Sequence, residues 1–432
     1  MEKDIQMNNV KKKYDYLIVG AGLCGLSLAS KLSANNKSVL LLEKGGQANH
    51  LGSLLFAACL YDKGALARSI EGTIIYRAFG IGGTSLISCS NAVMPSQSYL
   101  DGIGLDITSE IIDMQKKFKV SDKSYPLGPK SLKIMKAAND LGYTTVMMPK
   151  FTPHKSCRLC GHCELGCKYG VKWTALDLLN DSKQEYITLM PGITVARVLN
   201  KNGKAVGVSA KSWNKIPLKF YADKIIISAG GIGTPVILQN SGIPAGERLF
   251  VDLFNVTYGY DKTISAKLDP PMNIICSQFH ETGGYILSNF VDNPAGFAST
   301  VNIKNIPKIL HIKKVIGIMT KIQDDAQGKV YADGKVSKSP TEEDKLKLEN
   351  GSKRAKEILL KIGIKPENIF VTKPRGAHPG GTAAINMVVN DRLETQIKNL
   401  FVCDPSIFPE SPGVPPMLTL LAVTAKFAKL LN

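Results

Sequence analysis

The feature that most constrains the fold of this chain is the glycine-rich turn GAGLCG at residues 20–25. An apolar segment at 15–19 predicts a strand that leads into the turn, and apolar residues at helical spacing follow it. A second apolar segment, 38–42, completes a strand–helix–strand unit. This order predicts an α/β fold whose parallel sheet begins near the N-terminus.

Each glycine of the turn has its own steric role in dinucleotide binding. Gly20 permits the tight turn, Gly22 lets the backbone approach a pyrophosphate, and Gly25 allows helix and strand to pack closely. The phosphates then lie at the helix N-terminus, where backbone amides favour anions. Glu43, at the end of the second strand, is placed to accept hydrogen bonds from ribose hydroxyls. The chain is therefore predicted to bind a dinucleotide.

A second glycine-containing segment is expected to reach the same ligand. The apolar residues 225–228 predict a buried strand that leads into Ala229 and Gly230, and a short helix is predicted over 236–240. Glycines at this point would let the backbone approach the dinucleotide closely.

Elsewhere the apolar spacing predicts helices and strands in a mixed order. Helices are predicted over 129–141, 344–361 and 417–430, a hairpin turn at Asn202-Gly203, strand-rich sequence over 255–330, and a strand at 400–402. Because nucleotide-type segments recur late in the chain, one discontinuous α/β domain with an inserted domain is favoured.

Several segments, taken in order, resemble the glucose–methanol–choline oxidoreductase family. They are GIGGTSLIS (80–88), ARVLNKNGKAVGV (196–208), IIISAGGIGTPVILQNSGI (225–243), GAHPGGTAAI (376–385) and VCDPSIFPESPGVPPMLTLLAVTAKFAKLL (402–431). The resemblance implies a two-domain α/β flavoprotein, with a Rossmann-type FAD-binding domain and an antiparallel-sheet substrate domain. That second domain is expected to be reduced, because chains of the family are usually longer.

This resemblance and the order of elements divide the chain into parts. Residues 1–13 are expected to form a basic arm, 14–95, 187–255 and 372–432 the discontinuous FAD-binding domain, 96–186 a cysteine-rich insertion, and 256–371 the substrate domain. Some members of the family attach the flavin to a histidine just before the position of Gly82. This chain has none there, so non-covalent FAD is expected.

The resemblance also implies which residues bind FAD and which one is catalytic. Cofactor contacts are expected from Gly20, Gly22, Gly25, Glu43, Gly82, Gly83, Thr84, Ser85, Val195, Ala229, Gly230, Asp404, Pro416 and Met417. His378 is the expected catalytic base, because this histidine lies near the flavin in the family and an imidazole titrates near neutral pH. A histidine or asparagine usually lies opposite it. Here Pro415 occupies that place, and its side chain can neither donate nor accept a hydrogen bond.

The cysteines cluster in the middle of the chain. Cys157, Cys160, Cys163 and Cys167 lie within eleven residues, the spacing of ferredoxin-type segments, and predict the ligands of a [4Fe–4S] cluster. A [3Fe–4S] cluster would need only three of them. A structural zinc ion also suits four thiolates, and unliganded structural cysteines are the third interpretation.

The net charge of +18 does not indicate nucleic-acid binding, because the lysines are spread over the whole chain without an interleaved aromatic pattern. A solvated lysine-rich surface, an acidic protein partner and an anionic membrane surface all fit this charge. No apolar run predicts a transmembrane helix. The N-terminal residues lack the apolar core of a secretory signal, which favours the cytoplasm and reduced cysteines.

These features predict an FAD-dependent dehydrogenase that oxidises an alcohol- or sugar-type CH–OH group. The electrons would leave one at a time through the cluster, to a redox protein or a quinone. Two alternatives stay open. The first is a flavin and iron–sulfur reductase of a C=C or quinone-like substrate, which the proline at position 415 favours. The second is a non-catalytic electron-transfer subunit of a larger complex.

Overall fold

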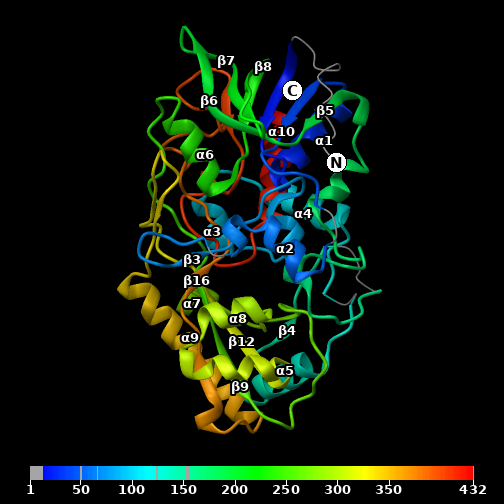
Figure 1. Cartoon of the computed structure of the whole chain (residues 1–432), viewed down its shortest axis with the longest axis vertical. Helices are drawn as coiled ribbons and strands as arrows, with labels where there is room; N and C mark the ends of the chain where they lie inside the picture. Colours follow the sequence, from blue (N-terminus) through cyan, green and yellow to red (C-terminus); the bar gives the residue numbers. More distant parts are fainter. Residues whose placement is uncertain (1–12, 49–50, 66, 123–124, 152–155, 432) are drawn as a thin grey trace.

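The computed structural model describes residues 13–48, 51–65, 67–122, 125–151 and 156–431. Two sheets dominate it, one in each half of the elongated molecule (Figure 1). The described N-terminal strand and the C-terminal helix both belong to the upper half in that view. Within these ranges no helix is both long and apolar enough to cross a membrane.

The first sheet combines parallel strands with a hairpin edge, in the order β5-β2-β1-β8-β7-β6, with β17 beside β8. Its strands are β1 (Tyr14–Val19), β2 (Val39–Leu42), β5 (Ile187–Met190), β6 (Ile193–Lys201), β7 (Lys204–Ser212), β8 (Pro217–Ile227) and β17 (Leu400–Val402). Residues of β1 and β2 are buried almost throughout, as expected for parallel strands covered on both faces.

Helices α1 (Leu23–Ala34) and α10 (Met417–Leu431) pack on each other beside this sheet, near α4 (Thr108–Lys117). Most of α10 is buried, and the hydroxyls of Ser27 and Thr424 share a hydrogen bond of 2.7 Å between α1 and α10. The end of the chain is thereby held beside its beginning.

The second sheet has the order β3-β16-β9-β12-β11-β10-β4, with β15 beside β9. Its strands are β3 (Ile74–Ile75), β4 (Val146–Met147), β9 (Phe254–Tyr260), β10 (Ile274–Cys276), β11 (Tyr285–Asn289), β12 (Val315–Ile322), β15 (Ile369–Val371) and β16 (Arg375–Gly376). Helix α9 (Glu342–Lys361) contacts β9, β11 and β12, and also α5 (Pro129–Asp140). A separate short ribbon joins β13 (Lys329–Val330) and β14 (Val336–Ser337).

Shorter elements lie between these strands and helices along the chain. They are α2 (Leu54–Leu60), η2 (Asp62–Ala65), η3 (Gly83–Ile87), α3 (Gln97–Gly102), η4 (Cys163–Leu165), η5 (Ala175–Leu179), η6 (Gln184–Tyr186), α6 (Gly230–Gln239), α7 (His280–Gly283), α8 (Pro294–Thr300), η7 (Ile303–Lys314), η8 (Pro366–Asn368) and η9 (Pro405–Ile407). Short strands from two of the predicted parts join the second sheet: β3 and β16 from the predicted FAD-binding domain and β4 from the predicted cysteine-rich insertion. The predicted domain boundaries stay a prediction, and most of the basic arm lies outside the described residues.

The predicted glycine turn, the hairpin and the three long helices are confirmed within a few residues. At the hairpin, Asn202 and Gly203 both have positive φ, as a type I′ turn requires. The predicted start of the short helix at 236 is wrong, because α6 begins at Gly230. Pro235 lacks the amide that would bond to the Gly231 carbonyl, and the hydroxyl of Thr382 donates to that carbonyl instead, at 2.7 Å.

A second prediction needs correction. Sequence 255–330 is not dominated by strands alone, because α7, α8 and η7 lie between β10 and β12.

Candidate active site

A cavity of about 390 Å³ opens at the carboxyl ends of β1 and β8. Ligands of open parallel sheets bind at this edge. Most residues predicted to contact FAD line it: Gly20, Gly22, Glu43, Gly83, Thr84, Ser85, Val195, Ala229, Gly230, Asp404, Pro416 and Met417. Gly25 and Gly82 are not among its lining residues. The roles of all these residues in cofactor binding stay predictions.

The three glycines of the first turn differ in what surrounds them. A Cβ added at Gly20 would collide with the Ser228 carbonyl, and one at Gly25 would collide with the Gly20 carbonyl. A Cβ at Gly22 would meet nothing within 4 Å, because this residue lines the cavity. The turn therefore packs tightly on the sheet and leaves its backbone open toward the cavity, which fits the pyrophosphate of a dinucleotide.

Glu43 is buried, and its carboxylate braces the loops around the cavity. Oε2 accepts a hydrogen bond from the amide of Ala21 at 2.8 Å, and Oε1 accepts from the amides of Gly45 at 2.8 Å and Gly80 at 3.2 Å. The sequence predicted only a ribose contact for this residue. Its structural role in holding the glycine turn was missed.

Asp404 joins the end of β17 to the start of α6. Its carboxylate accepts hydrogen bonds from the amides of Gly230 and Ser406, both at 2.8 Å, and from the hydroxyl of Thr234. Burial raises the pKa of Asp404, while the hydrogen bonds from Ser406 and Thr234 act in the opposite direction. Asp404 therefore fixes the amide-rich start of α6 at the cavity wall.

A second cavity, of about 240 Å³, adjoins the first. Five residues line both: Thr84, Ser88, Ala377, His378 and Met417. The walls of the second cavity are mostly apolar, and include Phe254, Met272, Phe290 and Met319 from the second sheet and the loops beside it. A small molecule in this cavity would lie next to a cofactor in the first.

His378 lies at the junction of the two cavities as part of a buried charge network. Its Nδ1 is 2.8 Å from Oδ2 of Asp252, and the same oxygen is 2.7 Å from Nζ of Lys321. Although burial by itself raises the pKa of Asp252, Lys321 and the hydrogen bond with His378 lower it to about 2. Asp252 is therefore a carboxylate at neutral pH and holds the Nδ1–H tautomer of His378.

Lys321 also lines the second cavity. Burial lowers its pKa, and Asp252 acts in the opposite direction. Beyond this ion pair, Nζ has no hydrogen-bond partner among the described residues. Pro415 lines the same cavity, and its side chain offers no hydrogen-bonding group. Lys321 of β12 places a polar group in this cavity.

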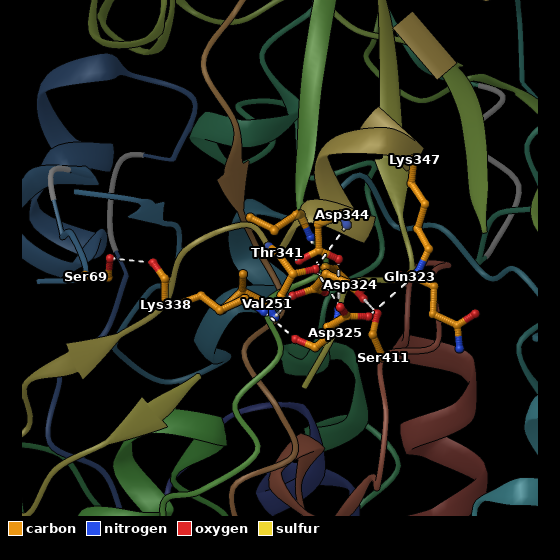
Figure 2. A network of polar contacts seen from close by, with 12 residues as sticks. Ser69, Val251, Gln323, Asp324, Asp325, Lys338, Thr341, Asp344, Lys347 and Ser411 are labelled. Carbon is orange, nitrogen blue, oxygen red and sulfur yellow. Dashed lines mark hydrogen bonds and ion pairs between the residues drawn. The ribbon is translucent and has the colours of Figure 1, made fainter. Parts of the chain in front are cut away.

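A polar network around Asp324 holds the backbone next to Asp252, and Figure 2 labels Val251, Asp324, Lys338 and Ser411 within it. The amide of Val251 donates to Oδ2 of Asp324 at 3.1 Å, and Nζ of Lys338 is 2.8 Å from the same oxygen. The hydroxyl of Ser411 donates to Oδ1 of Asp252. These contacts fix the carboxylate that orients His378.

Sequence reasoning missed Asp252 and Lys321. Each is a single charge inside an apolar run, FVDLF at 250–254 and VIGIMTKI at 315–322. A charged residue in the middle of such a run is rarely buried without a partner. That signal could have singled out both residues, although it could not have paired them.

The four predicted metal ligands lie in one segment, and all four are partly buried. Among the described residues, no three histidine, cysteine or carboxylate side chains converge in an arrangement that could hold a metal ion. Glu164 and Leu165, from the same segment, line the second cavity. The cysteine segment therefore forms part of the substrate-side wall without a closed ligand set.

Two buried lysines lie beside these cysteines. Nζ of Lys172 donates to the carbonyls of Leu86 and Ser88 at 2.7 Å and of Cys163 at 2.9 Å. Nζ of Lys150 also reaches only neutral oxygens, in residues 89, 91 and 272. Within the described ranges neither ammonium forms an ion pair with a carboxylate. Burial lowers the pKa of both lysines, and the nearby cysteine side chains act in the opposite direction. Thiols are the donor type of a thiolate-ligated group, but among the described residues they do not converge on one point.

Family models for the N- and C-terminal parts of GMC oxidoreductases match residues 14–268 and 325–424. The chain belongs to the GMC oxidoreductase family. It is an FAD-dependent oxidoreductase of the type that acts on CH–OH donors. The predicted family, fold class and FAD cofactor are confirmed.

Similar curated proteins come from distant organisms. An uncharacterised protein of Methanocaldococcus jannaschii is 30% identical, over 96% of this chain and 99% of its own length. A long-chain-alcohol oxidase of Arabidopsis thaliana, FAO4B, is 24% identical over 96% of this GMC protein but 66% of the plant chain.

Solved structures share the fold. Pyridoxine 4-oxidase from Mesorbium loti has a TM-score of 0.71 at 16% identity, covering 96% of this chain and 99% of that one. Formate oxidase from Aspergillus oryzae has a TM-score of 0.74 at 13% identity, covering 98% of each chain. At these identities the likeness concerns the fold alone.

Proposed function

We propose that this GMC oxidoreductase is a dehydrogenase that oxidises an alcohol-type CH–OH substrate to a carbonyl compound. The observation that carries the proposal is the position of His378, which lines both cavities while Asp252 holds its Nδ1 at 2.8 Å. An alcohol in the smaller cavity would meet the imidazole on one side and the cofactor on the other.

His378 acts as the base in this proposal. Its Nε2 takes the hydroxyl proton of the alcohol, and the carboxylate of Asp252 stabilises the imidazolium that results. Lys321 donates a hydrogen bond to the same substrate oxygen, which favours the alkoxide as it forms. FAD, when bound, supplies the acceptor for the two electrons and the hydrogen that leave the alcohol carbon.

We further propose that the electrons leave through an iron–sulfur cluster held by Cys157, Cys160, Cys163 and Cys167. The support is electrostatic. Among the described residues, Lys150 and Lys172 are buried without an ion pair to a carboxylate, and a thiolate-ligated cluster would supply negative charge beside them. Such a cluster carries one electron at a time, which suits a protein or quinone acceptor. To bind such a cluster, the four cysteine side chains would have to converge on one point.

Replacement of His378 by Asn tests the base. We expect anaerobic flavin bleaching by primary alcohols to slow by about 10²–10⁴-fold with FAD content unchanged, the usual contribution of a positioned base. His311→Asn is the matched control, because His311 is exposed and lines neither cavity. Near-normal bleaching by the His378→Asn protein would assign the proton transfer to another group.

Metal analysis tests the cluster. Protein purified without oxygen should contain about four iron and four acid-labile sulfides per chain, the content of a [4Fe–4S] cluster. Cys160→Ser should lose this iron, keep FAD, and still be bleached by alcohol while electron transfer to an added quinone slows. Cys59→Ser, at an exposed cysteine, should behave as wild type. One zinc per chain without iron would contradict the proposal.

A further inference from the structure

The mouth of the substrate cavity lies between two short helices. Leu54 of α2 and Ala295 of α8 both line the cavity and are both exposed to solvent. In Figure 1, α2 and α8 lie close to each other near the middle of the molecule, above and below. A substrate would therefore enter between them.

The segment after α8 presents apolar side chains to solvent. Ile303, Ile306, Pro307 and Leu310 of the 3-10 helix η7 are all exposed. With three residues per turn, Ile303 and Ile306 lie on one edge of η7 and Pro307 and Leu310 on the next. Ile303 is 85% exposed and Leu310 is 82% exposed. Ile309 and Ile312 pack against the core, so η7 leaves its remaining large apolar side chains in solvent.

Helix α2 adds to this apolar rim. Leu55 is 75% exposed, and its neighbour Leu54 is 44% exposed at the cavity mouth. We call Leu54, Leu55, Ile303, Ile306 and Leu310 the entrance surface. Among the described residues, α2 at the mouth and η7, which packs on α8, therefore both leave large apolar side chains exposed.

The charge around the entrance surface is positive. Residues 294–314 contain four lysines, at 304, 308, 313 and 314, and no acidic residue. Lys304 and Lys313 are exposed. Projecting Ile and Leu side chains flanked by lysines suit insertion between the headgroups of an anionic bilayer, because the apolar side chains reach the acyl boundary while the ammonium groups meet lipid phosphates.

We propose that the entrance surface docks on an anionic membrane and that the substrate is an apolar alcohol dissolved in that membrane. The mostly apolar cavity walls, with Phe254, Met272 and Phe290, would accept its hydrocarbon chain as it leaves the lipid. Its hydroxyl would reach His378 at the far end. The inference rests on the proposed function for the chemistry, but the docking can be measured without turnover.

Sedimentation with vesicles tests the docking. FAD-loaded protein should bind vesicles of phosphatidylglycerol and phosphatidylcholine, and should bind pure phosphatidylcholine vesicles far less. The double variant Ile303→Asp/Leu310→Asp should bind the anionic vesicles at least about tenfold more weakly. The control is Leu346→Asp/Met387→Asp, which changes two apolar side chains that are 57% and 64% exposed elsewhere. The control should bind as wild type.

Kinetics distinguish the docking from the chemistry. With a sixteen-carbon primary alcohol held in anionic vesicles, Ile303→Asp/Leu310→Asp should raise the apparent KM about tenfold and leave kcat unchanged. With a short soluble alcohol the same variant should match wild type. If no alcohol bleaches the flavin but vesicle binding persists, the proposed function fails and the docking stands.

Two outcomes would overturn the docking. One is equal vesicle binding by the double variant and wild type. The other is a wild-type dimer in ultracentrifugation that the double variant abolishes, without vesicle binding by either, because the entrance surface would then contact a second copy of the chain.

Discussion

Two regions of the molecule bury lysines in opposite ways. Lys321 of β12 and Lys338, which follows β14, each lie within 2.7–2.8 Å of a buried aspartate. Beside the cysteine segment, Lys150 and Lys172 are also buried but donate only to carbonyl and amide oxygens of the described residues. In the part of the chain that the structure describes, the lysines of the first region therefore form ion pairs with carboxylates, and those of the second do not.

The difference suggests that the lysines beside the cysteine segment face a negatively charged group that is not part of the chain. A buried ammonium without a counter-charge is costly, and evolution rarely retains one without a use. In the first region the carboxylates serve both the fold and His378. In the second, the partially buried thiols beside the lysines are the nearest source of negative charge, and they supply it only when they are deprotonated, as in metal ligation.

The largest effect on stability is expected at the Asp252–Lys321 pair. Asp252→Ala leaves Lys321 buried without a carboxylate, so the free energy of unfolding should fall by about 3–5 kcal/mol. Urea denaturation measures it. Adding Lys321→Met to Asp252→Ala should recover part of the loss, since the unpaired charge is then removed. A stability loss below about 1 kcal/mol in the single variant would break the comparison.

Lowering the pH should also remove the stabilisation that the Asp252–Lys321 pair provides. Asp252 has a folded-state pKa of about 2, whereas an unperturbed aspartate titrates near about 3.9. Because the folded pKa is lowered, the stabilisation is complete above about pH 5 and is lost as the pH falls through about 4 toward 2, on the order of 2 kcal/mol. Denaturation curves at several pH values should show this slope, and Asp252→Asn should flatten it.

Glu43 extends the comparison to a buried carboxylate. Its hydrogen bonds among the described residues come from backbone amides and not from a lysine. Glu43→Ala should weaken FAD binding by about 1–2 kcal/mol, since hydrogen bonds to a charged group are lost in a desolvated site. Equilibrium dialysis of FAD measures this change. Glu185→Ala, on the exposed side of η6, is the control and should bind FAD normally. Unchanged affinity in Glu43→Ala would leave the carboxylate a purely structural role.

The smallest effect on stability is expected at Lys172, beside the cysteine segment. Lys172→Met removes an ammonium that has no carboxylate partner among the described residues, but it also leaves the carbonyls of Leu86, Ser88 and Cys163 without their donor. The free energy of unfolding of the iron-free protein should therefore fall by about 1–2 kcal/mol. The same substitution should lower the iron content of anaerobically purified protein. A large stability loss with full iron content would show that Lys172 supports the fold only, and the two regions would then not differ as proposed.

Much of the fold followed from local sequence. The steric demands of Gly20 and Gly25, the positive φ of Asn202-Gly203 and the apolar spacing of α10 act over a few residues, so their consequences were predictable. The position of His378 near the cofactor cavity followed from the family resemblance, because a motif carries its place in the fold with it.

The partners of His378 could not be predicted from the sequence. Asp252 precedes β9, Lys321 belongs to β12, and His378 follows β16, so the three meet only because neighbouring strands of the second sheet bring them together. The start of α6 was missed for a related reason, since the hydroxyl of Thr382, far along the chain, satisfies the Gly231 carbonyl.

The sequence by itself determined the dinucleotide-binding unit, because steric and periodic constraints are local, and its resemblance to the family indicated the candidate catalytic histidine. Only the tertiary structure decided which charges are balanced, which side chains line the substrate cavity, and where its mouth opens. Pairing between distant residues depends on strand order and register, and neither is encoded in the spacing of a single segment.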